Sequence, residues 1–140
     1  MGYPYLGDIV LFAGNYAPQG WMLCDGQTLQ IQQYAALFSL LGVSYGGNGA
    51  QTFALPDLRG RMPLGAGQAG GMSFLPGQRG GVERNEPTVQ AVAAATAEAK
   101  DAGSKALTVA AAQPYENTSP YLALNYIICV EGSYPMPEDW

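Results

Sequence analysis

The sequence contains no histidine and only two cysteines, Cys24 and Cys129. Without histidine the chain lacks the commonest general base and a preferred zinc ligand, and two thiols are too few for a four-thiolate site. These absences exclude Ser–His–Asp and Cys–His catalysis, and catalysis by zinc-bound water, as such sites are usually built. We therefore expect no enzymatic activity, no cofactor and no structural transition metal.

Charge is also scarce. Only 12% of the residues are charged, about half of the usual fraction. The net charge of −5 gives no global attraction to nucleic acid or to an anionic membrane. No apolar run reaches the roughly 18–20 residues of a membrane span, and Met1–Asp8 lacks the basic start and apolar stretch of a signal peptide. We expect synthesis in the cytoplasm, no membrane insertion and no nucleic-acid partner.

What the sequence has in quantity is glycine, with 19 residues, and proline, with 10. This composition is typical of turns, short strands and irregular loops, and it disfavours a helical bundle or a coiled coil. The 48% of hydrophobic residues suffices for a core, and 140 residues suit one compact domain. We predict a small α+β fold, a single domain over residues 1–140, with an alanine-rich insert at about 88–112.

Three segments dominated by apolar residues are predicted to be strands: Tyr5–Ala13, Gly20–Cys24 and Pro120–Val130. The last is apolar apart from Asn125, which favours a buried central strand near the C-terminus. It most simply pairs with the strand near the N-terminus. Cys24 and Cys129 lie in predicted strands, so a disulfide is geometrically conceivable, but two buried free thiols are favoured.

One helix is predicted over Ile31–Leu41. Apolar residues recur there at helical spacing, Thr28 or Gln30 lies near the expected start, and Gly42 suits a left-handed C-terminal cap. The apolar stripe predicted to face the core consists of Ile31, Tyr34, Leu37, Phe38 and Leu41.

Residues 42–86 are dense in glycine, and we predict a long ordered loop region without a helix or a long strand. Its stretch Gly65–Gly71 resembles a dinucleotide-binding fingerprint, but it lacks the Gly-x-Gly-x-x-Gly spacing and the strand–helix context, so we expect no nucleotide site. The side chains predicted to pin this region to the core are Phe53, Leu55, Leu58, Met62, Leu64, Phe74 and Leu75.

Within this region, two prolines flank a cluster formed by Asp57, Arg59 and Arg61. A guanidinium group pairs with a carboxylate through a fork of two hydrogen bonds. Our structural interpretation is an ion pair that fixes the loop, with Arg59 or Arg61 reaching Asp57. The functional alternative is recognition of an anion by the two arginines.

The alanine-rich segment at 88–112 has few large side chains. Its propensity allows a helix over 89–102, although an extended conformation is slightly favoured. Alone it buries too little apolar area to offset the entropy of ordering, so our hypothesis is an element between subunits, and a surface loop is the alternative. The residues expected to anchor its two ends in a neighbouring copy are Val89, Val92, Leu107 and Val109.

Aromatic residues stand beside glycine, proline or asparagine in predicted loops. Flat rings suit sugar or protein surfaces because they give contact area at low entropic cost, although they also serve as structural plugs. The candidate ligand-facing residues are Tyr16, Tyr45, Tyr115 and Trp140. They support an alternative function as a soluble carbohydrate- or receptor-binding module.

Five blocks of the chain, in this order, form a distinctive pattern: Gly7–Asp25, Ala36–Gly47, Thr52–Pro63, Gly77–Gly81 and Gln113–Gly132. These blocks resemble the phage tail collar family, which also includes the bacterial microcystin-dependent proteins. The resemblance implies a small, loop-rich α+β domain that forms trimers near the end of tail fibres and takes part in attachment to a host cell. It implies no enzymatic activity.

The chain departs from this family in its missing histidines. Many members carry a Pro-x-His-x-His-like motif where this chain has Glu86–Ala91, and a histidine where it has Tyr115. A metal-stabilised trimer is therefore not implied. We expect a structural and adhesive subunit that forms a trimer or a fibre with its own copies, or that docks on a tail-like particle. A cell-surface glycan or a tail-fibre component is a further expected partner, and the expected location is an extracellular fibre or a virion, otherwise the cytoplasm.

Overall fold

The structure is a computed structural model that describes residues 3–82, 84–85, 115–116 and 119–137. The chain divides into two compact units, one formed by Met1–Arg79 with Ala123–Trp140 and the other by Gly80–Leu122. The alanine-rich insert predicted at 88–112 falls in the range of the second unit and lies outside the described residues. The first unit contains the core and the elements discussed below.

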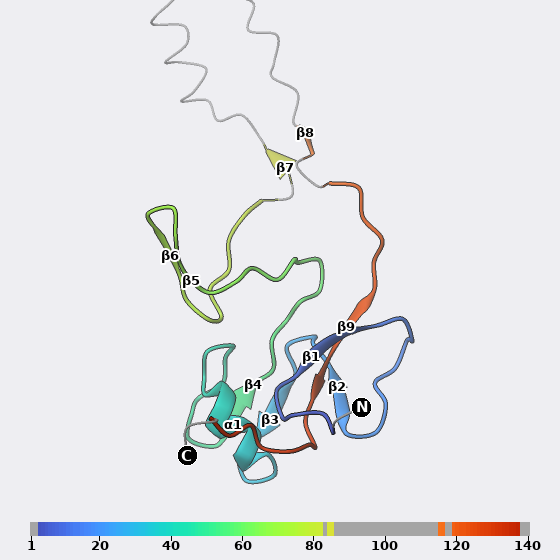
Figure 1. Ribbon diagram of the computed structural model, residues 1–140, viewed down its shortest axis with the longest axis vertical. Coiled ribbons are helices and arrows are strands. Elements are labelled where there is room, and N and C mark those ends of the chain that lie inside the picture. The colour runs from blue at the N-terminus through green and yellow to red at the C-terminus, as the bar shows by residue number, and fades with distance from the viewer. Residues whose placement is uncertain (1–2, 83, 86–114, 117–118, 138–140) are drawn as a thin grey trace, which may run out of the picture. The chain divides into compact units, whose positions relative to one another are not determined.

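A three-stranded antiparallel sheet of the first unit joins the two ends of the chain (Figure 1). Its order is β1 (Ile9–Phe12), β9 (Asn125–Cys129) and β2 (Trp21–Leu23). The predicted pairing of an N-terminal strand with a central, C-terminal strand is confirmed. The strands are shorter than predicted. A turn precedes β1, where the Asp8 N–H donates to the Tyr5 carbonyl at 3.0 Å and the Asp8 carboxylate accepts from the Tyr5 N–H. The strand predicted over Pro120–Val130 begins only at Asn125, and Tyr121 and Leu122 before it are 80% and 85% exposed.

A second, two-stranded sheet pairs β3 (Thr28–Gln30) with β4 (Thr52–Ala54), and the helix α1 (Ala35–Leu41) lies between them in sequence. The helix predicted over 31–41 is therefore too long at its start. The Ile31 N–H donates to the Gln51 carbonyl at 2.9 Å, which extends the β3–β4 pairing past Gln30. Thr28 and Gln30, predicted near the helix start, thus belong to a strand.

Gly42 ends the helix, and its N–H donates to the Phe38 carbonyl at 2.8 Å. Its φ of +57° is positive, as predicted, but its ψ of −142° lies outside the left-handed helical region. This combination is adopted essentially by glycine alone. The chain consequently leaves the helix through a backbone conformation that residues with a side chain disfavour.

The core of the first unit gathers β3, β4, β9 and α1. Its fully buried side chains include Phe53, Leu37, Leu55 and Ile128. The predicted apolar stripe is confirmed, since Leu37 is buried and the other four members pack against the core cluster. These members are Ile31, Tyr34, Phe38 and Leu41.

The two cysteines are buried and free, as the sequence favoured. Burial raises the pKa of the Cys24 thiol to about 12, with a further contribution from the negative charge of Asp25. Burial likewise raises the pKa of Cys129. Both thiols are consequently protonated near neutral pH and poor nucleophiles.

The glycine-rich region contains a short hairpin that the sequence analysis did not predict. Strands β5 (Gly67–Ala69) and β6 (Met72–Phe74) pair in antiparallel fashion around Gly70 and Gly71. These two glycines have φ values of +58° and +80°, which suits a two-residue hairpin turn with positive φ at both positions. The dinucleotide-like glycine pattern is thus part of a hairpin.

Several side chains predicted to pin this region do not reach the core. Phe53 and Leu55 are buried and Leu58 packs against the core cluster, as predicted. Met62, Leu64 and Leu75, in contrast, are largely exposed, so their predicted role is wrong. Phe74 is half-buried.

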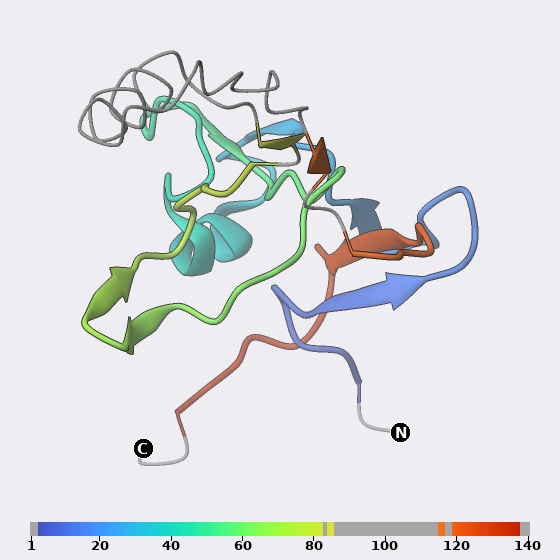
Figure 2. The ribbon, with the colours of Figure 1, turned by 90° about the horizontal axis from the view of Figure 1, so that it is seen from above.

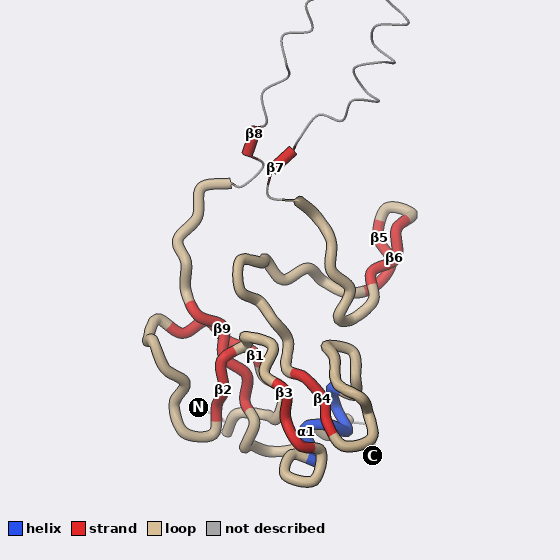
Figure 3. Tube along the Cα trace, turned by 180° about the vertical axis from the view of Figure 1, so that it is seen from behind, coloured by secondary structure: helices blue, strands red, loops and turns tan. Residues whose placement is uncertain are grey.

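The second unit contains one antiparallel pair, β7 (Arg84–Asn85) with β8 (Tyr115–Glu116), among its described residues (Figure 3). Across the described ranges, we find no helix with the length and apolar character needed to cross a membrane. The predicted small fold of short strands with one helix is confirmed at this coarse level.

Candidate functional site

The Asp57 loop leaves the core directly after β4. The Leu55 N–H donates to the Gln27 carbonyl and the Leu58 N–H to the Cys24 carbonyl, both at 2.9 Å. These two bonds hold the backbone on either side of Asp57 against the segment that joins β2 to β3. The Asp57 side chain consequently lies at the rim of the core and is only 17% exposed.

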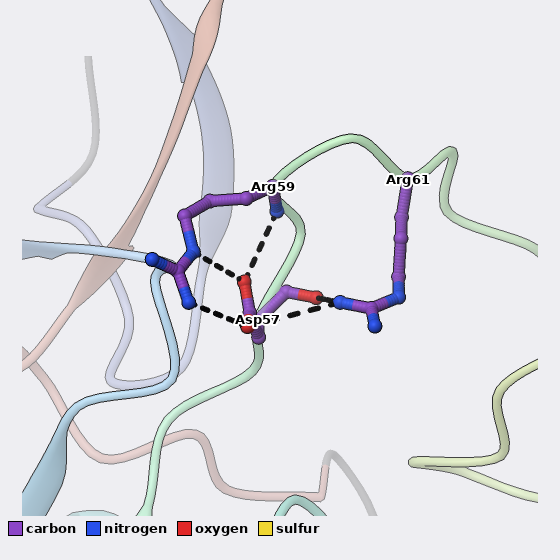
Figure 4. Close-up of polar contacts among 3 residues, drawn as sticks. All are labelled: Asp57, Arg59 and Arg61. Carbon is purple, nitrogen blue, oxygen red and sulfur yellow. Dashed lines mark hydrogen bonds and ion pairs between the residues drawn. The ribbon is translucent and has the colours of Figure 1, made fainter.

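Both arginines converge on Asp57 (Figure 4). The Arg59 Nε and Nη2 groups each donate to the Asp57 carboxylate at 2.9 Å, and the Arg59 backbone N–H donates at 3.2 Å. The Arg61 Nη1 group donates to the Asp57 carbonyl oxygen at 2.9 Å and lies 3.8 Å from its carboxylate. The three residues of the predicted loop staple are thus brought together.

The electrostatic consequence is a strongly stabilised carboxylate. The hydrogen bonds from the Arg59 side chain, aided by its backbone N–H and by the charges of both arginines, hold the pKa of Asp57 well below its usual range. The same hydrogen bonds raise the pKa of Arg59. Asp57 engages the Nε–Nη2 edge of Arg59, which is the edge that an external anion would need.

We predict that replacing Asp57 by asparagine destabilises the first unit at neutral pH. A carboxyl group whose pKa is lowered by folding contributes stability above its unfolded pKa of about 4, and this contribution is lost as the pH falls. The difference in free energy of unfolding between wild type and Asp57→Asn is therefore expected to be constant near neutral pH and to shrink in acid below about pH 4. Urea unfolding followed at several pH values measures it.

Arg59→Lys is the matched control, because it keeps the positive charge but loses the two-bond fork. We expect an intermediate loss of stability for this variant. A difference between wild type and Asp57→Asn that stays the same from neutral pH into acid would contradict the proposed role of the carboxylate.

An exposed arm, which we define as Arg59–Arg79, follows the Asp57 loop within the first unit (Figure 3). Every residue of the arm is exposed except Phe74 and Gly77, which are half-buried. The exposed apolar side chains of the arm are Met62 (88%), Leu64 (71%), Met72 (61%) and Leu75 (68%). Large apolar side chains that gather on one exposed segment are typical of an interaction surface.

The exposed arm nevertheless has a defined turn at Leu75–Gln78, after the β5–β6 hairpin. The Gln78 N–H donates to the Leu75 carbonyl at 3.0 Å, and the Gln78 side chain accepts from the Leu75 N–H at 2.9 Å. Gly77 has a φ of +84° and lies directly against the Ser44 carbonyl, where no Cβ could fit. The arm thus passes close to the segment after α1 at this point, while its large apolar side chains face solvent.

The other predicted site residues have different outcomes. Tyr16 is exposed and Tyr45 is half-buried, and no aromatic stacking joins the two rings within the described part of the chain. Tyr115 belongs to β8, where its backbone pairs with Asn85. The residues outside the described ranges are Val89, Val92, Leu107, Val109 and Trp140.

Sequence reasoning missed the exposure of β1 and of the arm. The rule that core residues are apolar works in one direction only, because much of a folded surface is also apolar. The available signal was the lack of alternation in Ile9–Phe12, where no polar residue marks a solvent face.

Among the residues that the structure describes, no group of three or more Cys, Asp and Glu side chains is placed to hold a metal ion.

Comparison with known proteins identifies the domain class. Residues 7–63, which span β1 to the Asp57 loop, match the family model of the phage tail collar domain. The resemblance to this structural family is thereby confirmed for residues 7–63. Protein RhiB of Rhizobium leguminosarum bv. viciae is 42% identical to the chain over 57 residues. That match covers 39% of this chain and 26% of RhiB, so the chain spans about a quarter of that relative.

Proposed function

We propose that the chain is a non-enzymatic structural and adhesive subunit that assembles with copies of itself. The assembly is a closed oligomer, such as a trimer, or an extracellular fibre, or a part of a tail-like particle. A closer likeness to the microcystin-dependent proteins is part of this proposal, as is a final location on a fibre or virion. The match of residues 7–63 to the tail collar domain supports it, because tail collar domains are structural.

The observation that carries the proposal is the exposed arm. Its four large apolar side chains are 61–88% exposed. No residue of its β5–β6 hairpin belongs to the core cluster of the first unit or packs against that cluster. Ordering an exposed segment costs about 1–2 kcal/mol of backbone entropy per residue, which buried apolar area normally offsets. A second copy that covers the arm would supply this area.

The alanine-rich segment is proposed as a second assembly element. Small side chains allow close approach of backbones, and anchoring at both ends would fix the segment in a neighbour. The proposed anchors are Val89, Val92, Leu107 and Val109. Contacts that close on themselves give a ring, whereas head-to-tail contacts that do not close give a fibre.

We predict that deleting Ala93–Ser104 leaves the first unit folded and reduces or abolishes assembly. The deletion removes no residue of β1–β6 or β9, so the thermal transition of the first unit should be retained. Size-exclusion chromatography with light scattering measures the mass, and negative-stain microscopy distinguishes rings from filaments. Equal assembly of the deletion variant and the full chain would show that the segment is only a loop.

A carbohydrate- or receptor-binding module is the second candidate function. The exposed ring of Tyr16, at 70%, is the observation that favours it. A monodisperse monomer with measurable glycan affinity, lowered by Tyr16→Ala, would support this candidate over the assembly subunit.

A further inference from the structure

Strand β1 is an edge strand that is apolar on both faces. It lies on the outer side of β9, and β2 occupies the other side of β9 (Figure 2). Ile127 and Ile128 of β9 are 2% and 1% exposed, whereas their β1 partners Val10 and Ile9 are 42% and 40% exposed. The burial that shields β9 from water therefore does not extend to β1.

The next residue of β1 strengthens this contrast. Leu11 is 56% exposed, and the side chains of Ile9 and Leu11 lie on the face opposite to that of Val10. Strand β1 contains no charged residue, proline or glycine. Natural edge strands usually carry charged residues or proline, because these prevent pairing with another chain.

The hydrogen-bond alternation shows which backbone groups of β1 are open. The Cys129 N–H donates to the Asp8 carbonyl at 2.9 Å, so alternate residues from Asp8 onward, including Val10, direct their backbone groups toward β9. The Tyr126 carbonyl, opposite Leu11, accepts from the Cys24 N–H on the other side of β9, which agrees with this alternation. The N–H and C=O groups of Ile9 and Leu11 consequently point away from β9.

No described residue makes a backbone hydrogen bond with these outward groups. An open row of donors and acceptors at an apolar edge is a template for strand addition. The edge carries the same groups in every copy, and two identical edges in antiparallel orientation satisfy each other.

We propose that β1 pairs with β1 of a second copy across a two-fold axis at Val10. This inference rests on the proposed self-assembly. Because a two-fold contact is isologous, it differs from the contact within a three-fold ring, and it either gives a dimer or joins two rings or two fibre subunits. In this register Ile9 of each copy exchanges both backbone hydrogen bonds with Leu11 of the other, which uses all the outward groups of β1. Val10 lies opposite Val10 of the second copy, and the two three-stranded sheets become one continuous sheet.

Charge and packing agree with this register. It places Asp8 of each copy opposite Phe12 of the other, so that the two Asp8 carboxylates lie at opposite ends of the paired strands. Pairs of β-branched and large apolar side chains across strands are favourable, whereas like charges directly opposite are not. The interface covers the apolar side chains of β1 that are 40–56% exposed in one copy.

The register predicts cross-linking at one position. Residues directly opposite in a pair without mutual hydrogen bonds have Cα atoms about 4.5 Å apart, which a disulfide can span. In the full chain, Val10→Cys should give disulfide-linked dimers under mild oxidation at least about tenfold faster than Leu11→Cys, whose partner is Ile9. The native cysteines should give little background, because they are buried and the pKa of Cys24 is raised to about 12.

Leu11→Pro provides a second readout. The Leu11 N–H points away from β9, so proline removes a bond of the proposed interface while leaving the β1–β9 ladder intact, and prolines are tolerated at such edge positions. This variant should keep the circular dichroism of the wild type but lose the two-fold contact, seen as a lower mass in light scattering. Val10→Pro is the contrasting variant, because it breaks the β1–β9 ladder itself.

The outcomes separate this inference from the proposed function. Equal cross-linking rates for Val10→Cys and Leu11→Cys, in a chain that still assembles, would overturn the β1 interface and leave self-assembly standing. A full chain that is monomeric at all concentrations would overturn both.

Discussion

Replacing Phe53 by alanine is expected to lower the free energy of unfolding of the first unit by about 3–5 kcal/mol. Phe53 is fully buried on β4, opposite Leu29 of β3. Its ring packs against that of Phe38 of α1, with centroids 5.5 Å apart and planes tilted by 56°. The side chain therefore joins the helix to the sheet, and its loss leaves a cavity between them.

The expected loss is a large fraction of the roughly 5–15 kcal/mol by which small domains are stable. Urea unfolding monitored by circular dichroism measures it. Met62→Ala is the matched control, since Met62 is 88% exposed and its truncation should change stability by less than about 0.5 kcal/mol. Similar effects for Phe53→Ala and Met62→Ala would mean that the core lies elsewhere.

Gly47→Ala is expected to be the most damaging glycine substitution before β4. Gly47 has a φ of +95°, a conformation that costs other residues about 1–2 kcal/mol. An added Cβ would also overlap the backbone of Phe53 and approach the Thr52 carbonyl at 2.6 Å. Since the obstacle is backbone and not a flexible side chain, β4 itself would have to move.

Hydrogen bonds in the loop around Gly47 prevent Gly47 from moving away from β4. The Asn48 side chain accepts hydrogen bonds from three successive backbone N–H groups, those of Ala50, Gln51 and Thr52, at 2.8–3.0 Å. The Ala54 N–H donates to the Gly46 carbonyl at 3.0 Å. The turn is thus fixed on both sides of the glycine.

Gly65→Ala is the control for Gly47→Ala. A Cβ at Gly65 meets no neighbour within 4 Å, and its φ is not positive. Thermal unfolding should show a clear fall in midpoint for Gly47→Ala and little change for Gly65→Ala. Equal midpoints for the two variants would disprove the close approach of Gly47 to β4.

The strand pairing was predictable from the sequence because it depends on a few strong features. Tyr126–Val130 is an uninterrupted apolar run, and a run of that kind requires cover on both sides. Tyr121 and Leu122 are equally apolar but exposed, a difference that the pattern does not reveal. The sheet order places β9 in the centre, with Ile127 and Ile128 buried. The Asp57 cluster was predictable for a similar reason, since its three residues lie within five positions and opposite charges at that spacing meet locally.

The start of α1 was not predictable from periodicity. Ile31 and Tyr34 do pack on the core at the expected spacing, but Ile31 is bonded to Gln51, a residue twenty positions away in the chain. A tertiary contact of this kind overrides local helix preference. The hairpin β5–β6 was not predictable from hydrophobic alternation, because each of its strands has only three residues.

The exposure of β1 and of the exposed arm could not be predicted. An apolar residue in the sequence can be covered by its own chain or by a second molecule, and the pattern alone does not distinguish these two cases. Leu64 and Leu75 satisfy the same composition rule as Leu55, yet only Leu55 is buried. The difference depends on where the chain leaves the core after Asp57. A surface that a second molecule covers has the same apolar composition as a core, because both are removed from water.

Self-assembly of the chain with its own copies is measured by the molar mass of the intact protein. Size-exclusion chromatography with multi-angle light scattering, over a series of dilutions, should give a mass that is an integral multiple of the chain mass, or a filament fraction that elutes in the void. A mass equal to that of one chain at every concentration would contradict the account.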